Sequence, residues 1–184
     1  VLLVRADAMY HDIGKTENPQ CFVENEGVGA KYHDGLTPLE SAKMIINHVT
    51  DGMRLAEKYN LPTIISDFII THHGTSCAAY FYNKYIQEGG DPANADEFFY
   101  KGKKPWTKEQ TILMICDSIE AASRTLKDTS PETFDKFVES IVASKINAGQ
   151  LDNADISLKE LYRIKSVLKS YLGPMVLTFS IAVF

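Results

Sequence analysis

The sequence predicts an all-α fold in which a bundle of helices is interrupted by one long irregular loop. Two observations predict it: apolar residues recur at the three- and four-residue spacing of helices in several windows, and the alternation typical of strands is nearly absent. With 184 residues, of which 45% are hydrophobic, the chain can form one globular domain with a core of its own.

Local signals at their ends place the helices. Thr37 followed by Pro38 is typical of a helix start, and Thr107 with Gln110 resembles a capping box. Gly74 is expected to end the helix that precedes it. The expected helices are an opening segment that ends at His11-Asp12, followed by residues 37–59, 62–74, 76–87, 107–126, 131–148 and 157–172.

Two connections are expected to be irregular. Residues 15–37 follow Gly14, which we expect to close the opening helix in a left-handed conformation, and they contain Gly27, Gly29 and Gly35. A loop of that length is more often functional than idle. Residues 88–106 contain several Gly and Pro residues that are typical of turns.

Charge and cysteine content exclude several classes of function. The formal net charge is -5, from 19 Lys and Arg against 24 Asp and Glu, so the chain lacks the basic field that long nucleic acid requires. The three cysteines are odd in number and widely spaced, which argues against a disulfide framework and favours a reducing, cytosolic setting.

The two strongly apolar runs at the ends of the chain are both short. Residues 1–4 are too few for a signal sequence, and residues 175–184 are too few to cross a bilayer as a helix. Because the chain opens without Met, we interpret it as a fragment of a longer protein. We interpret residues 175–184 as a docked terminal segment, with a membrane contact as the alternative.

All five histidines lie within the first 73 residues, and this clustering is the most informative feature of the sequence. They are His11, His33, His48, His72 and His73. Taken singly, each can be a hydrogen-bonded core residue or a metal ligand. Taken together with two carboxylates, these imidazoles suit Fe, Mn or Zn with open coordination positions.

The two carboxylates are Asp12 and Asp117. Asp12 adjoins His11, and adjacent side chains on a helix diverge by about 100°, so the imidazole can hold one ion while the carboxylate bridges towards a second. Asp117 lies in an apolar helical stretch, where a lone carboxylate is costly. It can be bound to metal, or neutralised by Arg124 on the same helical row.

These residues carry a resemblance. His11-Asp12, His48, His72-His73 and Asp117 resemble the H...HD...H...HH...D pattern of HD-domain metal-dependent phosphohydrolases. More narrowly, the chain resembles the cytoplasmic HD domain of bacterial seven-transmembrane-HD receptors. The segments that carry this likeness are Tyr10 to Lys15, the Phe22-Val23-Glu24-Asn25 loop, His33-Asp34, and residues 46–49, 71–75 and 121–124.

The resemblance covers about residues 1–170. It implies an HD-domain helical bundle over residues 1–172, with the long irregular loop after the HD motif. Residues 173–184 match nothing in the family and are expected to form a tail of uncertain structure.

The resemblance also implies an activity, the hydrolysis of cyclic di-AMP to linear pApA, with two divalent ions, Mn or Fe, as cofactors. His11, Asp12 and Asp117 would hold the first ion, while Asp12, His48, His72 and His73 would hold the second. A pair of such ions activates water for in-line attack on phosphorus. The family pattern has one more histidine upstream of the HD pair, at a place that precedes the start of this chain.

Asp12 and Lys15 are the expected catalytic residues, and four residues are expected to bind substrate. Lys15 could contact a phosphate oxygen, or could be a solvated charge after a helix. Arg124 could contact phosphate or orient Asp117. Thr75 and Ser76 follow the histidine pair and could donate hydrogen bonds to phosphate, or could simply terminate the helix.

Two further groups are interpreted as structural. His33 and Asp34 are expected to organise the Gly-rich loop. The aromatic residues 80–82 and Tyr85 are expected to pack in the core, with stacking on a base as the alternative.

The expected partner is a cyclic dinucleotide, and long nucleic acid is not expected. The resemblance places the domain on the cytoplasmic face of the bacterial inner membrane, attached only through a missing upstream transmembrane region, and a homodimer is possible. The alternatives are a mononucleotide phosphohydrolase and a non-catalytic helical module that senses nucleotide or metal. A cyclic di-GMP enzyme of the HD-GYP type is further away, because residues 74–77 read Gly-Thr-Ser-Cys.

Overall fold

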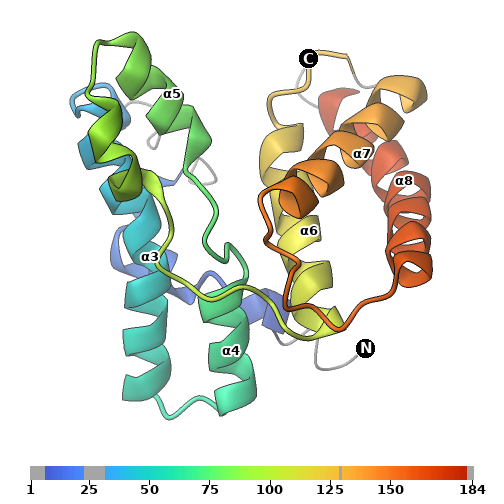
Figure 1. Cartoon of the computed structure of the whole chain (residues 1–184), viewed down its shortest axis with the longest axis horizontal. Helices are drawn as coiled ribbons and strands as arrows, with labels where there is room; N and C mark the ends of the chain where they lie inside the picture. Colours follow the sequence, from blue (N-terminus) through green and yellow to red (C-terminus); the bar gives the residue numbers. More distant parts are fainter. Residues whose placement is uncertain (1–6, 23–31, 129, 182–184) are drawn as a thin grey trace. The chain divides into compact units, whose positions relative to one another are not determined.

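Helices make up the regular structure of the described part of the chain. The computed structural model describes residues 7–22, 32–128 and 130–181, and side chains within this part as far as residue 171 (Figure 1). There the elements are α-helices and short 3-10 helices, with one isolated antiparallel bridge between Cys77 and Phe99. The predicted all-α fold is confirmed.

The chain divides into two compact units, residues 1–103 and residues 104–184. The first contains α3 (Pro38–Lys58), α4 (Thr63–Thr71) and α5 (Ala79–Gln87), with the 3-10 helices η1 (Ile13–Glu17), η2 (Pro19–Cys21) and η3 (Pro92–Phe98). The second contains α6 (Lys108–Ser123), α7 (Pro131–Asn147) and α8 (Leu158–Ile181). The predicted domain limits, 1–172 and 173–184, stay a prediction.

The predicted helix starts of α3 and α6 are confirmed in detail. The Thr37 hydroxyl accepts a hydrogen bond from the Glu40 backbone, and the Glu40 carboxylate accepts from the Thr37 backbone. Thr107 and Gln110 form the same reciprocal arrangement at the start of α6. Each box satisfies backbone donors that the first turn of a helix leaves without partners.

Four helix ends differ from the prediction, and one of them is that of α6, which ends at Ser123 and not at residue 126. α4 ends at Thr71, before the predicted Gly74, although Gly74 does adopt the left-handed conformation with φ of 57°. α5 begins at Ala79 because the preceding residues run alongside residues 98–100, where the Ala78 amide donates to the Phe98 carbonyl at 2.8 Å. α8 continues past residue 172 to Ile181.

The prediction that Gly14 ends the opening helix in a left-handed conformation is wrong, and glycine is needed there for another reason. Residues 7–10 are helical and His11-Asp12 form a turn after them, but Gly14 lies inside η1 without a left-handed φ. A Cβ atom on Gly14 would lie 1.8 Å from the His48 carbonyl oxygen and 2.5 Å from the Gly52 nitrogen. Glycine is therefore required because η1 crosses α3 at backbone contact.

Each unit has its own buried residues. In the first unit, α3 and α4 contribute Ala42, Leu55, Phe68 and Ile69, all of them at most 4% exposed. In the second unit, α6, α7 and α8 share a core of Ile115, Ile119, Phe134, Val138, Val142, Leu161 and Leu168. All three cysteines are free. Among the described residues, we find no helix that is both apolar and long enough to pass through a bilayer.

Candidate metal centre

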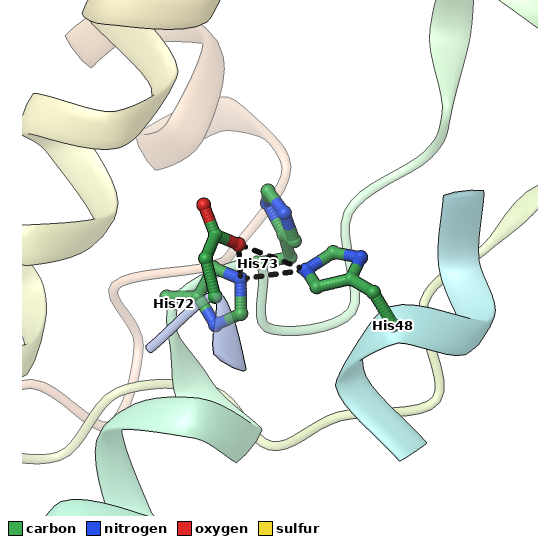
Figure 2. A group of neighbouring side chains, drawn as sticks. His48, His72 and His73 are labelled. Carbon is green, nitrogen blue, oxygen red and sulfur yellow. Dashed lines mark hydrogen bonds and ion pairs between the residues drawn. The ribbon is translucent and has the colours of Figure 1, made fainter. Parts of the chain in front are cut away.

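Four predicted metal ligands from separate parts of the first unit lie together. Asp12 precedes η1, His48 lies in the middle of α3, and His72-His73 follow α4. One ligand atom from each of the four lies within 4.8 Å of the others. Figure 2 shows the rings of His48, His72 and His73 turned towards one another. The cluster therefore collects residues that are as much as 61 positions apart in the sequence, from Asp12 to His73.

Backbone carbonyls fix two of these rings. His48 Nδ1 donates to the Ile45 carbonyl at 2.6 Å, and His72 Nδ1 donates to the Ile69 carbonyl at 2.8 Å. A carbonyl only accepts, so the hydrogen is on Nδ1 and each neutral ring presents a lone pair at Nε2. Both side chains are buried, with 1% and 0% exposed.

The atoms at the centre of the cluster are all acceptors. The Nε2 atoms of His48 and His72 are 3.0 Å apart, and Asp12 Oδ1 lies 3.2 Å from the first and 3.5 Å from the second. Oδ1 is buried without a hydrogen-bond partner. Lone pairs that face each other at this distance repel unless a cation or a proton lies between them. Two imidazole nitrogens and a carboxylate oxygen are a donor set that fits a divalent transition metal.

The second oxygen of Asp12 faces different partners. His11 Nε2 lies 3.2 Å from Asp12 Oδ2, and His11 Nδ1 donates to the Ala8 carbonyl at 3.0 Å, in the same manner as His48 and His72. Lys15 Nζ lies 2.7 Å from the same oxygen. Asp12 thus stands between two groups of side chains, one on each oxygen.

This setting controls the ionisation of Asp12. Burial acts to raise the pKa of the carboxyl group, but the ring nitrogens of His11, His48 and His72, which donate to the carboxylate when they carry a proton, outweigh burial and hold its pKa well below the usual range. Asp12 is therefore a carboxylate, the form that binds metal.

The predicted substrate-binding residues fall in both units. In the first unit, Lys15 also lies over the Phe22 ring, 5.2 Å from its centroid, and the Ser76 carbonyl accepts from the Tyr100 amide. Thr75 and Ser76 follow Gly74 directly after the histidine pair. In the second unit, Arg124 Nη2 donates to Glu120 Oε1 at 2.7 Å at the end of α6.

Asp117 lies on α6, which belongs to the second unit. The four clustered residues Asp12, His48, His72 and His73 all belong to the first unit. The assignment of Asp117 to the first ion stays a prediction. The same holds for a contact of Arg124 with phosphate.

His33 is separate from this group. Its Nε2 donates to the Cys21 carbonyl at 2.8 Å, and its ring lies 5.2 Å from that of Phe81. This contact joins two residues of the predicted Gly-rich loop, and the organising role of His33 and Asp34 stays a prediction. Residues 23–31, which include Gly27, Gly29 and most of the Phe22–Asn25 segment, lie outside the described residues.

The aromatic residues of α5 divide into two groups. Tyr82 and Tyr85 lie against Phe98, with ring centroids 5.3 Å and 5.0 Å apart, but both are only half-buried, because α5 lies at the surface and has no fully buried residue; the core-packing interpretation is met only in part by these two and is wrong for Tyr80. Tyr80 is 73% exposed.

Sequence reasoning missed Tyr100. It lies in the connection predicted to be irregular, and its ring stacks on that of His73 with centroids 4.2 Å apart and an angle of 26° between the planes. The side chain is buried. Its sequence neighbourhood carries no motif, because the contact arises from two segments that are 27 positions apart.

Known proteins resemble the chain in sequence. The model of the HD domain family matches residues 1–122. The cyclic-di-AMP phosphodiesterase PgpH of Bacillus subtilis is 41% identical over 167 residues, which cover 91% of this chain and 23% of that protein. PgpH of Listeria monocytogenes is 38% identical over 172 residues, which cover 94% of this chain and 24% of that protein. The chain thus spans about a quarter of the length of these relatives.

Solved structures resemble it as well. The crystal structure of the L. monocytogenes PgpH HD domain matches with a TM-score of 0.85 and 35% identity, and covers 95% of this chain and 81% of that one. The same domain in complex with cyclic di-AMP matches with a TM-score of 0.88 and 36% identity, with the same coverage. The chain therefore belongs to the HD domain family and is homologous to the HD domain of PgpH.

Proposed function

We propose that the chain is the hydrolase domain of a cyclic-di-AMP phosphodiesterase and converts cyclic di-AMP to linear pApA. The observation that carries the hydrolase assignment is the convergence of Asp12, His48, His72 and His73 on one point with their acceptor atoms inward. The substrate follows from the relatives, two of which are named cyclic-di-AMP phosphodiesterases, and from a homologous domain whose structure contains cyclic di-AMP.

The proposed cofactors are two divalent ions, Mn or Fe. Asp12, His48, His72 and His73 would hold one of them, and the opposed acceptors at the centre of the cluster support this assignment. His11, Asp12 and Asp117 would contribute to the other. Two such ions supply Lewis acidity, which activates water as a nucleophile and offsets the charge that develops on the phosphate.

The protein's own residues hold the proposed metal ligands in position. The carbonyls of Ile45 and Ile69 hold the rings of His48 and His72, so these ligands need little reorganisation when an ion binds. Asp12 can serve both ions at once because its two oxygens already face different sets of partners.

Basic and hydroxyl groups at the edge of the cluster are the proposed substrate contacts. Lys15 Nζ, beside Asp12 Oδ2, places a positive charge where it could meet a nonbridging phosphate oxygen. Thr75 and Ser76 would donate hydroxyl hydrogen bonds to phosphate from just beyond the histidine pair. Arg124 would either contact phosphate or orient Asp117.

We also propose that the domain works on the cytoplasmic face of the bacterial inner membrane, joined to it by parts of a longer protein. The resemblance to the seven-transmembrane-HD receptors supports this location. The coverage of about a quarter of the length of the PgpH relatives is consistent with it.

The test is a turnover assay with several substrates. The chain, and a form extended upstream of Val1, are incubated with Mn²⁺ or Fe²⁺ and with cyclic di-AMP, cyclic di-GMP or a mononucleotide, and the products are separated by anion-exchange chromatography. We expect pApA from cyclic di-AMP and none after EDTA treatment. Binding of cyclic di-AMP without turnover in both forms would favour the sensor, and preferential hydrolysis of the mononucleotide would favour the mononucleotide phosphohydrolase.

A further inference from the structure

The ring of His73 lies close to two other rings. The His72 ring is 4.1 Å away between centroids, with an angle of 45° between the planes. The Tyr100 ring is stacked on it, with centroids 4.2 Å apart and the planes within 26° of parallel. Tyr100 also meets the His48 ring at its edge, with centroids 6.1 Å apart and an angle of 80°. Tyr100 thus contacts two of the proposed ligands of one ion.

The backbone around Tyr100 is fixed to the segment that carries His73. The Tyr100 amide donates to the Ser76 carbonyl at 2.9 Å, the Ala78 amide to Phe98 at 2.8 Å, and the Lys103 amide to Ile70 at 2.9 Å. These hydrogen bonds lie on both sides of the stacked pair. The ring of Tyr100 therefore has a fixed position relative to that of His73.

Gly102 permits this close approach of the two segments. A Cβ atom on Gly102 would lie 2.4 Å from the Ile70 carbonyl oxygen and 2.6 Å from that of Gly74. Only glycine has room at that position, so the segment from Phe98 to Lys103 can lie directly against residues 70–78.

A stacked aromatic ring restricts an imidazole in a specific way. Rotation of the His73 ring about its Cβ–Cγ bond would turn its edge into the face of the Tyr100 ring, and the stacked arrangement of the two rings would be lost. For His48 and His72 the same restriction comes from the Nδ1 hydrogen bonds to carbonyls. Tyr100 is only 7% exposed, so water does not compete with it for the face of the His73 ring that it covers.

We propose that Tyr100 is a positioning residue that holds the His73 ring in the orientation needed to ligate the ion shared with Asp12, His48 and His72. This inference rests on the proposed metal centre. It assigns the role to the flat face of the side chain and none of it to the hydroxyl group.

The primary test compares two substitutions of Tyr100 by their affinity for Mn²⁺, measured on the whole chain in competition with a chelator. Tyr100→Phe keeps the ring and should bind within about twofold of the unsubstituted protein. Tyr100→Leu keeps apolar bulk but loses the flat face, and should bind about 10- to 100-fold more weakly, which is the usual effect of removing a group that orients a metal ligand. Tyr59→Leu, at a tyrosine of the same unit that is 60% exposed, is the matched control and should leave the affinity unchanged.

A second measurement tests whether Tyr100 acts through His73. In a His73→Ala background, Tyr100→Leu should weaken Mn²⁺ binding no further, because the ring that it positions is gone. The visible absorption spectrum of the Co²⁺-loaded protein should also change in the same direction in Tyr100→Leu and His73→Ala. A further loss of affinity in the double variant would overturn the proposal.

Other outcomes are equally decisive. If Tyr100→Leu binds Mn²⁺ as tightly as the unsubstituted protein, or if Tyr100→Phe loses as much affinity as Tyr100→Leu, the stacking role is wrong while the metal centre stands. If the unsubstituted protein binds no ion at this cluster, the metal centre itself is wrong. Should Tyr100→Leu not fold, the ring-proton resonances of His73 in the unsubstituted protein decide: an upfield ring-current shift is expected, and its absence would overturn the stacking.

Discussion

His48 and His72 face each other with their Nε2 atoms 3.0 Å apart, while both Nδ1 atoms are bound to backbone carbonyls. The two Nε2 atoms can both act as acceptors only when a cation or a proton lies between them, and a divalent ion would satisfy both at once. Stability should therefore depend on metal.

Divalent metal should raise the melting temperature of the unsubstituted protein, because ligand that binds only the folded state stabilises it by about 2.7 kcal/mol at 100 times its Kd. His48→Ala and Asp12→Asn should each abolish most of this increment. Thermal unfolding followed by circular dichroism, with Mn²⁺ and with EDTA, measures it. His33→Ala is the control, since His33 binds the Cys21 carbonyl outside the cluster, and it should retain the increment. An equal increment in all variants would contradict a metal centre at this place.

Gly14→Ala should both destabilise the protein and weaken metal binding. Its Cβ would occupy the position where η1 touches the His48 carbonyl, so η1 and the adjoining Asp12 must move away from α3. We expect a loss of about 3 kcal/mol in the free energy of unfolding, as for severe overpacking. Urea denaturation gives this value. Gly35→Ala, whose Cβ would meet nothing within 4 Å, should change stability by less than about 1 kcal/mol. Similar values for the two variants would show that the close approach is not required.

Lys15→Met should reduce turnover of cyclic di-AMP without removing metal. Loss of one hydrogen bond to a charged group corresponds to a decrease of about 10- to 100-fold in kcat/KM. Steady-state kinetics together with metal analysis of the purified variant separates the two effects. Lys43→Met is the matched control, because Lys43 pairs with Glu97 on the surface. If Lys15→Met lowers metal content as much as activity, Lys15 acts on Asp12 and not on phosphate.

Glu160→Gln should reduce the loss of folding stability that occurs as the pH falls. Hydrogen bonds and charge from Lys108 and then hydrogen bonds from Ser157 lower the pKa of Glu160 to about 2. A carboxyl group with a lowered pKa in the folded state contributes stability above its unfolded pKa of about 4.3, and this contribution is lost as pH falls towards 2. Urea unfolding between pH 6 and pH 2 should show a smaller decline for Glu160→Gln than for the unsubstituted protein. Parallel profiles would mean that the Lys108–Glu160 pair at 2.6 Å does not persist in solution.

Local signals explain what the sequence predicted correctly about the fold. The capping boxes at Thr37 and Thr107 involve residues three positions apart, so the sequence contains all of the information. The role of Gly14 and the late start of α5 depend on contacts with distant segments, which no local pattern encodes. Gly173 and Pro174 are typical of a helix end, yet α8 continues to Ile181.

The candidate site divides in the same way. His11-Asp12, His48 and His72-His73 could be predicted because they match a spaced family pattern, and four residues of that set do converge. The sequence did not indicate how the two oxygens of Asp12 would be shared between partners. Nor could it indicate Tyr100, whose contact with His73 depends on the hydrogen bonds between residues 98–103 and residues 70–78.

Those backbone hydrogen bonds also limit how far the first unit can be truncated from its C-terminal end. A truncation after residue 91 would retain Asp12, His48, His72 and His73, yet it would remove the strip of chain that Tyr100 and Gly102 occupy. A fragment meant to retain the cluster should therefore extend at least to Lys103 and should not be cut directly after the last histidine.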